Sequence, residues 1–263
     1  MGVAADDTRP GRRTPWGAAL RAASRQLEWR ALRLGLGRCP LCSGRFFVRF
    51  SRDLLGTRCL GCGASPISTA IGEVVRRRVP DLADADVLEL SSRGSFHAFL
   101  RRSVARGRGS LTDCEYFDDV EPGDSRDGVQ CQDVQHLTYA DASFDLCTST
   151  EVFEHVPDDV RGFSELFRVL RPGGTLAFTV PLSSRDETVP RAHRTAEGIV
   201  HLEEPCYHDD LIRGAERVLV YRDYGRDVTA RVGRAGFADA HVESVPDAAG
   251  FGGVASVVVA RRP

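Results

Sequence analysis

The chain has 263 residues, of which 42% are hydrophobic and 27% are charged, as in a globular protein with a sizeable core. No apolar run approaches the ~18 residues of a membrane-spanning helix, and the first residues lack the apolar stretch of a signal peptide. We therefore expect neither a membrane span nor secretion.

The net charge is −2, and the charged residues are unevenly distributed along the chain. Residues 1–80 contain 15 arginines and 5 acidic residues, whereas residues 81–263 contain 20 arginines and 32 acidic residues. The first part therefore has a net charge of +10 and the second a net charge of −12. This asymmetry predicts two units with different electrostatic roles.

Residues 1–37 are expected to form a polar tail followed by an amphipathic helix. Residues 1–15 are polar and contain two prolines. Residues 16–34 have apolar side chains at spacings of four and three, which is the period of a helix with one buried face. This apolar stripe consists of Trp16, Leu20, Ala23 and Leu27. We expect the helix to pack on its own protein, with a membrane surface or an RNA as the alternative partner.

Residues 38–66 carry two C-x-x-C pairs and are expected to form a small zinc-ribbon-like module. The pairs are Cys39 with Cys42 and Cys59 with Cys62, and 16 residues separate them. Four thiolates complete the tetrahedral shell that zinc prefers and leave no open position, so the predicted zinc is structural. The other four cysteines are scattered, which favours a reducing compartment, and hence a cytoplasmic protein, over a disulfide framework.

From residue 67 the pattern changes to strands that alternate with helices, which is typical of a mostly parallel α/β sheet. A connecting helix over 67–78 comes first. Strands are expected at 86–90, 110–115, 144–149, 174–180 and 254–260, and helices at 95–105, 158–170 and 226–235. We therefore expect one α/β domain over 67–263, with an insertion at 182–224.

Four stretches of this domain carry a resemblance to a known family. They are VLELSSRGS (87–95), LTDCEYF (111–117), CQDVQHLTYADASFDLCTSTEVFEHVPDD (131–159) and FRVLRPGGTLAFTVP (167–181). Over residues 80–240 the chain resembles class I S-adenosylmethionine-dependent methyltransferases, above all the ubiquinone and menaquinone biosynthesis methyltransferases. The resemblance implies a Rossmann-like, doubly wound, mostly parallel sheet of seven strands, preceded here by the zinc-ribbon-like module.

The resemblance also implies which residues bind the S-adenosylmethionine cofactor. Glu89, at the end of the first strand, would hold the ammonium group of the methionine part. Glu115 would accept the ribose hydroxyls, with Asp113 as the rival on the same face of the second strand. The implied cofactor-binding set is Glu89, Leu90, Ser91, Gly94, Glu115, Asp133, Val134, Thr150 and Glu151.

The turn at 91–94 departs from the family pattern because serine and arginine stand where glycine is usual. No phosphate has to be bound here, so glycine is less strictly required than in a dinucleotide site. Ser91 is small enough for a close approach, whereas Arg93 must point away from the cofactor. A degenerate fold that binds no cofactor and serves as a non-catalytic adaptor is the alternative.

Three histidines are candidates for a general base, which methyl transfer needs only where the acceptor must lose a proton, as a hydroxyl must. His208 and His201 lie in GIVHLEEPCYHDD (198–210), within the insertion that often builds the acceptor pocket of the resembled family. His155 follows Glu154 beside the expected donor site. A second metal site or plain hydrogen bonding in 198–210 remains an open alternative.

These observations predict methylation of a small polar acceptor, first of all O-methylation of a sugar, a glycan precursor or another hydroxylated metabolite. An rRNA methyltransferase is the alternative, because some of these enzymes join a zinc module with a C-P-x-C start to the same fold. The basic first unit favours nucleic acid, whereas the EVFEHVPD segment and the acidic second unit favour a small molecule. A homodimer is compatible with the sequence.

Overall fold

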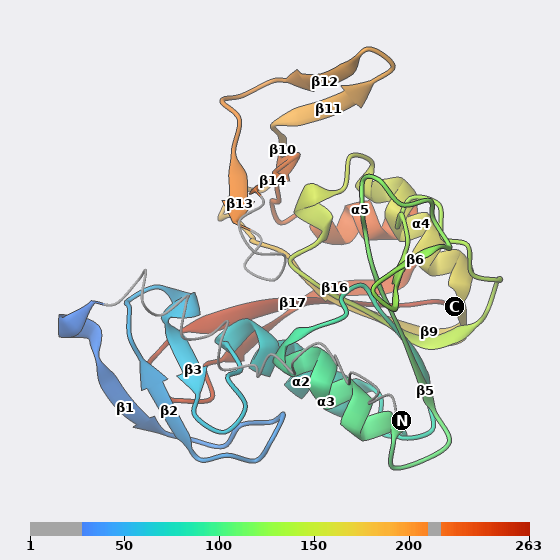
Figure 1. The fold of residues 1–263 in the computed structure, drawn as a ribbon. Coiled ribbons are helices and arrows are strands. Elements are labelled where there is room, and N and C mark those ends of the chain that lie inside the picture. Colours follow the sequence, from blue (N-terminus) through green and yellow to red (C-terminus); the bar gives the residue numbers. More distant parts are fainter. Residues whose placement is uncertain (1–27, 210–216) are drawn as a thin grey trace, which may run out of the picture.

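The computed structural model describes residues 28–209 and 217–263. Its centre is an eight-stranded sheet in the order β16 (Ala238–Pro246), β17 (Val254–Arg261), β9 (Leu170–Thr179), β8 (Phe144–Thr150), β4 (Asp86–Glu89), β5 (Ser110–Glu115), β7 (Val129–Cys131) and β6 (Ser125–Arg126) (Figure 1). Strands β4, β5, β7, β8 and β9 pair in parallel, whereas β17 is antiparallel to β9 and β16, and β6 to β7. The predicted mostly parallel sheet is confirmed. Within the described residues the central sheet has eight strands and not the predicted seven, because the two-residue strand β6 extends the edge beside β7.

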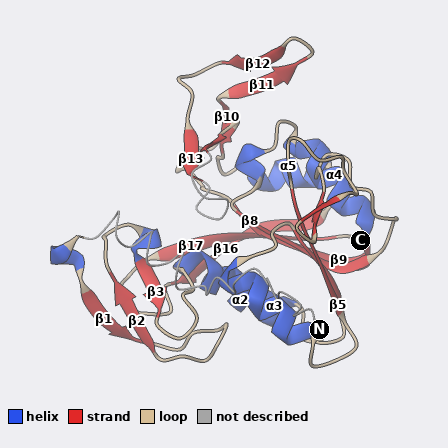
Figure 2. Ribbon diagram, viewed as in Figure 1, coloured by secondary structure: helices blue, strands red, loops and turns tan. Residues whose placement is uncertain are grey.

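Helices cover both faces of the sheet, as Figure 2 shows. Helices α2 (Pro66–Arg78) and α3 (Gly94–Val104) pack on one face, and α4 (Asp159–Val169) and α5 (Val228–Arg234) on the other. Adjacent residues of β4 point to opposite faces, so Val87 joins the core under α2 and α3, and Leu88 joins the core under α4 and α5. A strand that is buried on both faces is typical of a parallel sheet between two helical layers. The doubly wound, Rossmann-like architecture is therefore confirmed.

The N-terminal module is an antiparallel sheet of β1 (Arg33–Leu36), β2 (Phe46–Arg49) and β3 (Thr57–Cys59). Short 3-10 turns, η1 (Trp29–Ala31) and η2 (Leu54–Gly56), precede β1 and β3. The prediction of a helix over 16–34 is wrong for residues 28–34. Residues 16–27 lie outside the described residues. The ladder between β1 and β2, in which Leu34 pairs with Val48, outweighs the local helical pattern. The sheet of the module therefore begins before residue 38.

The module packs on the α/β domain through Leu41. This side chain is 5% exposed and shares a core with Phe96 of α3. Helix α2 approaches it closely at Gly72, where a Cβ atom would lie 2.1 Å from Leu41 Cδ2 and would displace the leucine side chain. Arg76 Nη1 donates a hydrogen bond of 2.8 Å to the carbonyl of Pro40. The module is therefore fixed to α2 and α3 by apolar and polar contacts.

Residues 182–224 contribute three small two-stranded sheets at one end of the domain. They are β10 (Val189–Pro190) with β15 (Arg222–Asp223), β11 (Ala192–Thr195) with β12 (Gly198–His201), and β13 (Tyr207–Asp209) with β14 (Arg217–Leu219). The β11–β12 hairpin projects away from the central sheet (Figure 1). Among residues 28–209 and 217–263, no helix is long and apolar enough to cross a bilayer.

Candidate functional site

The carboxyl ends of β4, β5 and β8 meet at one edge of the sheet. From the central strand β4 the chain passes through α3 to β5 on one side, while β8 lies on its other side. Ligands of doubly wound folds bind in the crevice at such a reversal of strand order. Glu89, Glu115 and Thr150 end these three strands. The edge therefore gathers three of the residues expected to bind the cofactor.

Glu89 is a buried acid at the centre of this edge. It is 1% exposed and accepts a hydrogen bond from the hydroxyl of Thr148 on β8. The pKa of Glu89 is raised to about 8, mainly because a charged carboxylate is poorly solvated when buried, with a further contribution from the negative charges of Glu115 and Asp113. A buried acid among other acids is well suited to a cationic ligand group such as an ammonium.

Glu115 is tied to the turn that follows β4. Its Oε1 accepts hydrogen bonds from the backbone N–H and the hydroxyl of Ser92, both at 3.0 Å. Asp113, the rival acid on β5, lies beside α3, where its Oδ2 is 3.5 Å from His97 Nε2. The structure thus brings Glu115 into contact with the 91–94 turn and Asp113 into contact with α3.

The 91–94 turn allows a ligand to approach the backbone closely. Gly94 has a φ of +92°, which favours glycine, and no atom lies within 4 Å of the place that a Cβ would take. Ser91 is partly exposed, and Arg93 is exposed. The N–H of Leu90 donates to the carbonyl of Thr148 at 3.0 Å, so the pairing between β4 and β8 continues up to the turn.

Asp133 and Val134 follow β7 on the same edge. Asp133 Oδ1 accepts hydrogen bonds from the backbone N–H and the side chain of Gln135, at 2.9 and 3.0 Å, which fix the orientation of the carboxylate. Val134 is 7% exposed and packs in the core under α4. Both residues therefore lie at the carboxyl edge, and the side chain of Val134 belongs to the core.

Thr150 and Glu151 mark the end of β8 with unusual local structure. Glu151 has a φ of +54°, in the left-handed region that non-glycine residues rarely adopt, and its N–H donates to Thr179 at 3.0 Å. Burial raises the pKa of Glu151 to about 7. The buried hydroxyl of Thr150 has no hydrogen-bond partner among the described residues. Backbone strain and an unsatisfied polar group are typical of functional positions.

His155 and His208 come together in the structure, and an acid lies between them. Their rings meet edge to face with centroids 5.0 Å apart. Glu154 Oε1 is 3.7 Å from His155 Nε2 and 3.7 Å from His208 Nδ1. His201 lies elsewhere, exposed on β12 and paired with Ala192 in the projecting hairpin. The structure therefore groups two of the three predicted histidines.

Sequence reasoning misses two residues of this region, Glu154 and Arg222. Glu154 belongs to the turn η3 (Phe153–His155), and Arg222, which is 6% exposed, holds this turn by its guanidinium group. Arg222 donates to the carbonyls of Phe153 at 2.8 Å, Val156 at 2.6 Å and Pro157 at 2.6 Å. The E-x-x-E-H spacing of 151–155 could have indicated Glu154, whereas no local pattern indicates Arg222.

The four cysteines of the N-terminal module form a cluster that fits a tetrahedral metal ion. Their Sγ atoms lie within 4.8 Å of one another, with 3.7 Å between Cys39 and Cys62 and 3.6 Å between Cys42 and Cys59. Four sulfurs at ~2.3 Å from one zinc ion would be ~3.8 Å apart. The N–H of Gly44 points to Cys42 Sγ at 3.4 Å, and a Cβ on this glycine would come within 3.1 Å of that sulfur. The cluster therefore has the dimensions of a zinc-thiolate site.

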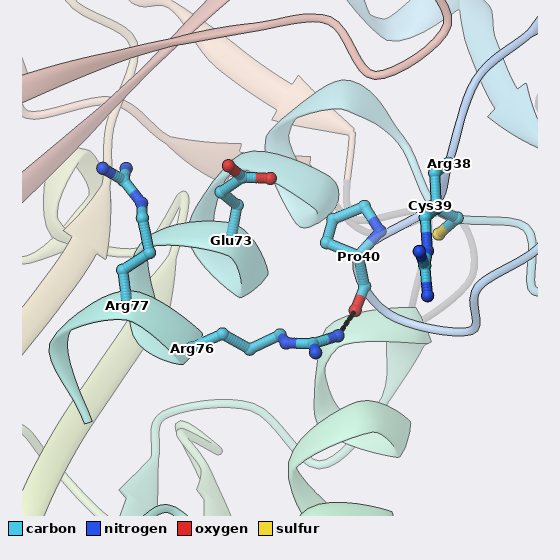
Figure 3. Close-up of a pocket in the computed structure, with 6 residues that line it drawn as sticks. All are labelled: Arg38, Cys39, Pro40, Glu73, Arg76 and Arg77. Carbon is cyan, nitrogen blue, oxygen red and sulfur yellow. Dashed lines mark hydrogen bonds between the residues drawn. The ribbon is translucent and has the colours of Figure 1, made fainter. Parts of the chain in front are cut away.

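A hollow of about 340 Å³ lies between this module and α2 (Figure 3). It is lined by Arg38, Cys39, Pro40, Glu73, Arg76 and Arg77. Figure 3 shows Arg76 reaching across to the carbonyl of Pro40. None of the lining residues belongs to the carboxyl edge of the sheet, so this basic hollow is separate from the candidate cofactor site.

Part of this chain is similar to known methyltransferases. Residues 93–178 match a family model described as a methyltransferase domain. The glycine/sarcosine/dimethylglycine N-methyltransferase of Actinopolyspora halophila is 27% identical over 129 residues, which are 45% of this chain and 23% of that protein. The ubiquinone biosynthesis O-methyltransferase of Coxiella burnetii is 42% identical over 50 residues, which are 19% of this chain and 21% of that protein. The chain thus covers less than a quarter of the length of either relative.

The fold is shared over nearly the whole chain with a solved enzyme structure, the [4+2]-cyclase SpnF. The TM-score is 0.51 at 13% identity, with 95% of this chain and 93% of that chain covered. At this identity the likeness shows the fold alone, and one fold hosts several reactions. Together with the sheet order, it shows a Rossmann-like fold, and residues 93–178 within this fold match the methyltransferase-domain model.

Proposed function

We propose that the protein is an S-adenosylmethionine-dependent methyltransferase that methylates a hydroxyl of a small polar acceptor, such as a sugar, a glycan precursor or another hydroxylated metabolite. The observation that carries the proposal is the row of acids Glu89, Glu115 and Asp133 along the carboxyl edge of the sheet. One of the relatives above is an O-methyltransferase of ubiquinone biosynthesis and the other an N-methyltransferase. The resemblance to the ubiquinone type favours oxygen as the methylated atom.

The residues of this edge suit the parts of the cofactor. Glu89 would hold the ammonium group, and the open backbone at Gly94 would allow the methionine part to approach the turn. Glu115, oriented by Ser92, would accept the ribose hydroxyls, and Asp133 would accept the adenine amino group. The bound cofactor would supply a methyl group on a sulfonium sulfur, so the protein contributes mainly alignment.

The histidines next to this edge support a hydroxyl acceptor, whose proton must leave. Burial lowers the pKa of His208, which favours the neutral imidazole that can accept a proton. His155 lies beside it. His201, exposed on the hairpin, is less well placed for this role.

We also propose that Cys39, Cys42, Cys59 and Cys62 bind one structural zinc ion. The sulfur distances and the approach of Gly44 to Cys42 support this. Zinc would stabilise a module that has only three short strands of its own. Metal analysis of the purified chain should give one zinc per molecule.

Calorimetric titration of the zinc-loaded chain with S-adenosylhomocysteine tests the methyltransferase proposal. We expect saturable binding at one site per chain, followed by transfer of a labelled methyl group from S-adenosylmethionine to a member of a panel of hydroxylated metabolites. No detectable binding of either cofactor form would overturn the proposal and favour the non-catalytic adaptor.

An rRNA methyltransferase is the second candidate, because Arg38, Arg76 and Arg77 line the hollow beside the zinc module. Phosphate contacts made by such arginines would produce an affinity that falls steeply with salt. Methyl transfer to an rRNA fragment, and to no small hydroxylated acceptor, would favour this candidate.

A further inference from the structure

We propose that the apolar stripe of residues 16–27 covers an exposed apolar face of the zinc-ribbon-like module, the outer face. The stripe consists of Trp16, Leu20, Ala23 and Leu27, which lie outside the described residues. The outer face consists of Leu34, Leu36, Phe46 and Val48 of β1 and β2. The inference goes beyond the proposed methylation and does not depend on it, because it concerns only how the chain before residue 28 meets the module.

The sheet of the module has two different faces, of which the inner one packs on the α/β domain. Directly paired residues of an antiparallel sheet point to the same side, and neighbours along a strand point to opposite sides. On the inner face Gly35 pairs with Phe47, which is 1% exposed and belongs to the core shared with α2 and α3. A Cβ on Gly35 would lie 2.6 Å from the ring of Phe251, in the loop between β16 and β17. The domain therefore covers the inner face completely at this pair.

The outer face carries large apolar side chains that are exposed among the described residues. Leu34 pairs with Val48, and Leu36 pairs with Phe46, so these four side chains point away from the inner face. Leu34 is 79% exposed, Leu36 71% and Phe46 61%. The side of an antiparallel sheet that faces water is normally polar. Adjacent apolar side chains that are this exposed mark an interaction surface.

The described part of the chain begins at one end of this face. The N–H of Glu28 donates to the carbonyl of Phe50 at 2.8 Å, and Phe50 directly follows β2. The last residue of β2 pairs with the first residue of β1, so Glu28 lies at the end of the ladder where β1 begins. Residues 28–32 lead from there into β1, a length typical of a connection between a helix and a strand. A helix that ends at Leu27 can therefore run antiparallel to β1 over the outer face.

The stripe and the outer face have similar lengths. Spacings of four, three and four residues place the stripe on one side of a helix. At a rise of about 1.5 Å per residue, the part from Leu20 to Leu27 spans ~10 Å, and Trp16 lies ~6 Å further. Strand β1 spans ~10 Å from its first to its last residue, at about 3.4 Å per residue. The stripe is therefore long enough to contact both apolar pairs of the outer face.

The covalent connection favours this segment over a second copy of the chain or a membrane surface. A segment tethered through residues 28–32 meets the outer face at an effective concentration on the order of millimolar. A second copy would lose translational and rotational freedom on binding, whereas a tethered segment has lost most of it already. Contact between the stripe and the outer face removes apolar surface of both from water. The two surfaces therefore stabilise each other within one molecule.

Acrylamide quenching of tryptophan fluorescence tests the contact in the zinc-loaded full chain. The chain has two tryptophans, so Trp29→Phe leaves Trp16 as the only one. In this protein we expect Trp16 to be quenched less, and to emit at a shorter wavelength, than in a free peptide of residues 1–27. Both differences should disappear when Leu34→Ser and Leu36→Ser are added, because the serines remove the apolar partner.

The matched control is the addition of Ile199→Ser and Val200→Ser to the same Trp29→Phe protein. These two residues are also exposed and apolar, but they lie on β12 of the projecting hairpin. Protection of Trp16 should be retained in this control. Zinc content, measured in parallel, shows whether the module of each variant remains folded.

A change within the stripe provides a second test that leaves every described residue other than Trp29 unchanged. We expect Leu20→Ser to expose Trp16 to acrylamide as the outer-face variant does, because it removes an apolar contact of the same helix face. Arg21→Ser, at a position off the stripe, should retain the protection. Loss of protection in Leu20→Ser and in the outer-face variant, but in neither control, supports the contact.

Three other results would overturn the inference. The first is quenching of Trp16 as strong as in the free peptide, or protection that persists in either the outer-face variant or Leu20→Ser. The second is protection that rises with protein concentration together with a dimer in analytical ultracentrifugation, which would assign the outer face to a second copy. The third is protection that appears only with vesicles of phosphatidylglycerol, which would assign the outer face to an anionic membrane surface.

Discussion

Glu89 is an acid whose surroundings in the folded protein favour its neutral form. Its pKa is about 8 against an ordinary 4.5, because it is fully buried close to two other acids. Between these two values the folded protein holds a proton that the unfolded chain has released. The stabilising contribution of this proton is therefore fully present below the unfolded pKa, decreases as the pH rises and is lost above the folded pKa.

The variant Glu89→Gln should remove this pH dependence, because the amide is neutral at every pH. We expect wild-type stability to fall relative to the variant between about pH 5 and pH 8, by on the order of a few kcal/mol. Urea unfolding of both proteins across this range measures the difference. Glu121→Gln, at an exposed acid, should show no such trend, and a constant difference between wild type and Glu89→Gln would contradict the assignment.

Glu115 and Asp113 compete for the role of ribose ligand, and their contacts separate them. Glu115 is held against the 91–94 turn by Ser92, whereas Asp113 lies beside His97. We expect Glu115→Gln to weaken S-adenosylhomocysteine binding by about ten- to hundredfold. This factor corresponds to the free energy of one lost hydrogen bond to a charged group. Asp113→Asn should change this binding little. Calorimetry measures the affinity of both variants for S-adenosylhomocysteine. A larger loss of affinity in Asp113→Asn than in Glu115→Gln would assign the ribose to Asp113.

The sequence predicts those site residues whose neighbours along the chain define them. Glu89 ends an apolar strand, Glu115 ends the next strand, and the four module cysteines have the spacing of a zinc site. Glu154 differs, because its significance lies in being buried without a partner next to a histidine from the insertion. Burial and the approach of distant segments are tertiary properties, so no window of sequence shows them.

At the scale of elements, the zinc-ribbon-like module is joined to α3 where the candidate cofactor turn ends. Ser95 Oγ donates a hydrogen bond of 2.8 Å to the carbonyl of Cys62. Leu41, in the first cysteine loop, packs into the core shared with α2 and α3. Loss of order in the module should therefore disturb the turn at 91–94 and weaken the affinity for the cofactor.

Replacement of a buried ligand tests this coupling. We expect Cys59→Ser to lose zinc, to lower the midpoint of thermal unfolding and to weaken S-adenosylhomocysteine binding, because folding of the module depends on its metal. Metal analysis, thermal unfolding and calorimetry measure the three effects. Cys206→Ser, at a cysteine outside the cluster, is the control and should leave all three unchanged. A Cys59→Ser protein that keeps its zinc would refute the proposed ligand set.

The predicted elements from residue 67 onward appear close to their predicted bounds, whereas strand β16 and the short strands of 182–224 were not predicted. The helix predicted at 158–170 appears as α4, because Asp158 caps its first turn by accepting from the N–H of Arg161 at 3.0 Å. The short strands of 182–224 have two to four residues each, too few for a period to be visible. The sequence does not predict strand β1 for another reason. Residues 33–36 are extended only because they pair with β2.

At the scale of the whole molecule, four arginines near the zinc module make contacts within the protein. Arg77 and Arg78 of α2 pair with Glu243 of β16 at 2.8 and 2.6 Å. Arg76 and Arg102 donate to backbone carbonyls of the first cysteine loop. These arginines are therefore engaged within the protein, which reduces the positive surface that a nucleic acid would meet.

This arrangement predicts weak and non-specific binding of RNA. We expect a labelled rRNA fragment to bind with a dissociation constant no tighter than about 10⁻⁶ M near physiological salt, and to dissociate as salt increases, because only phosphate contacts contribute. The acidic second unit, with 32 acidic residues against 20 arginines, repels a long polyanion from the carboxyl edge but not a small neutral acceptor. Fluorescence anisotropy over a range of salt concentrations measures the affinity, and labelled S-adenosylmethionine measures any methyl transfer to the RNA. Tight binding that persists at high salt, together with methylated RNA, would show that the arginines around the hollow face a nucleic acid in addition to holding the module.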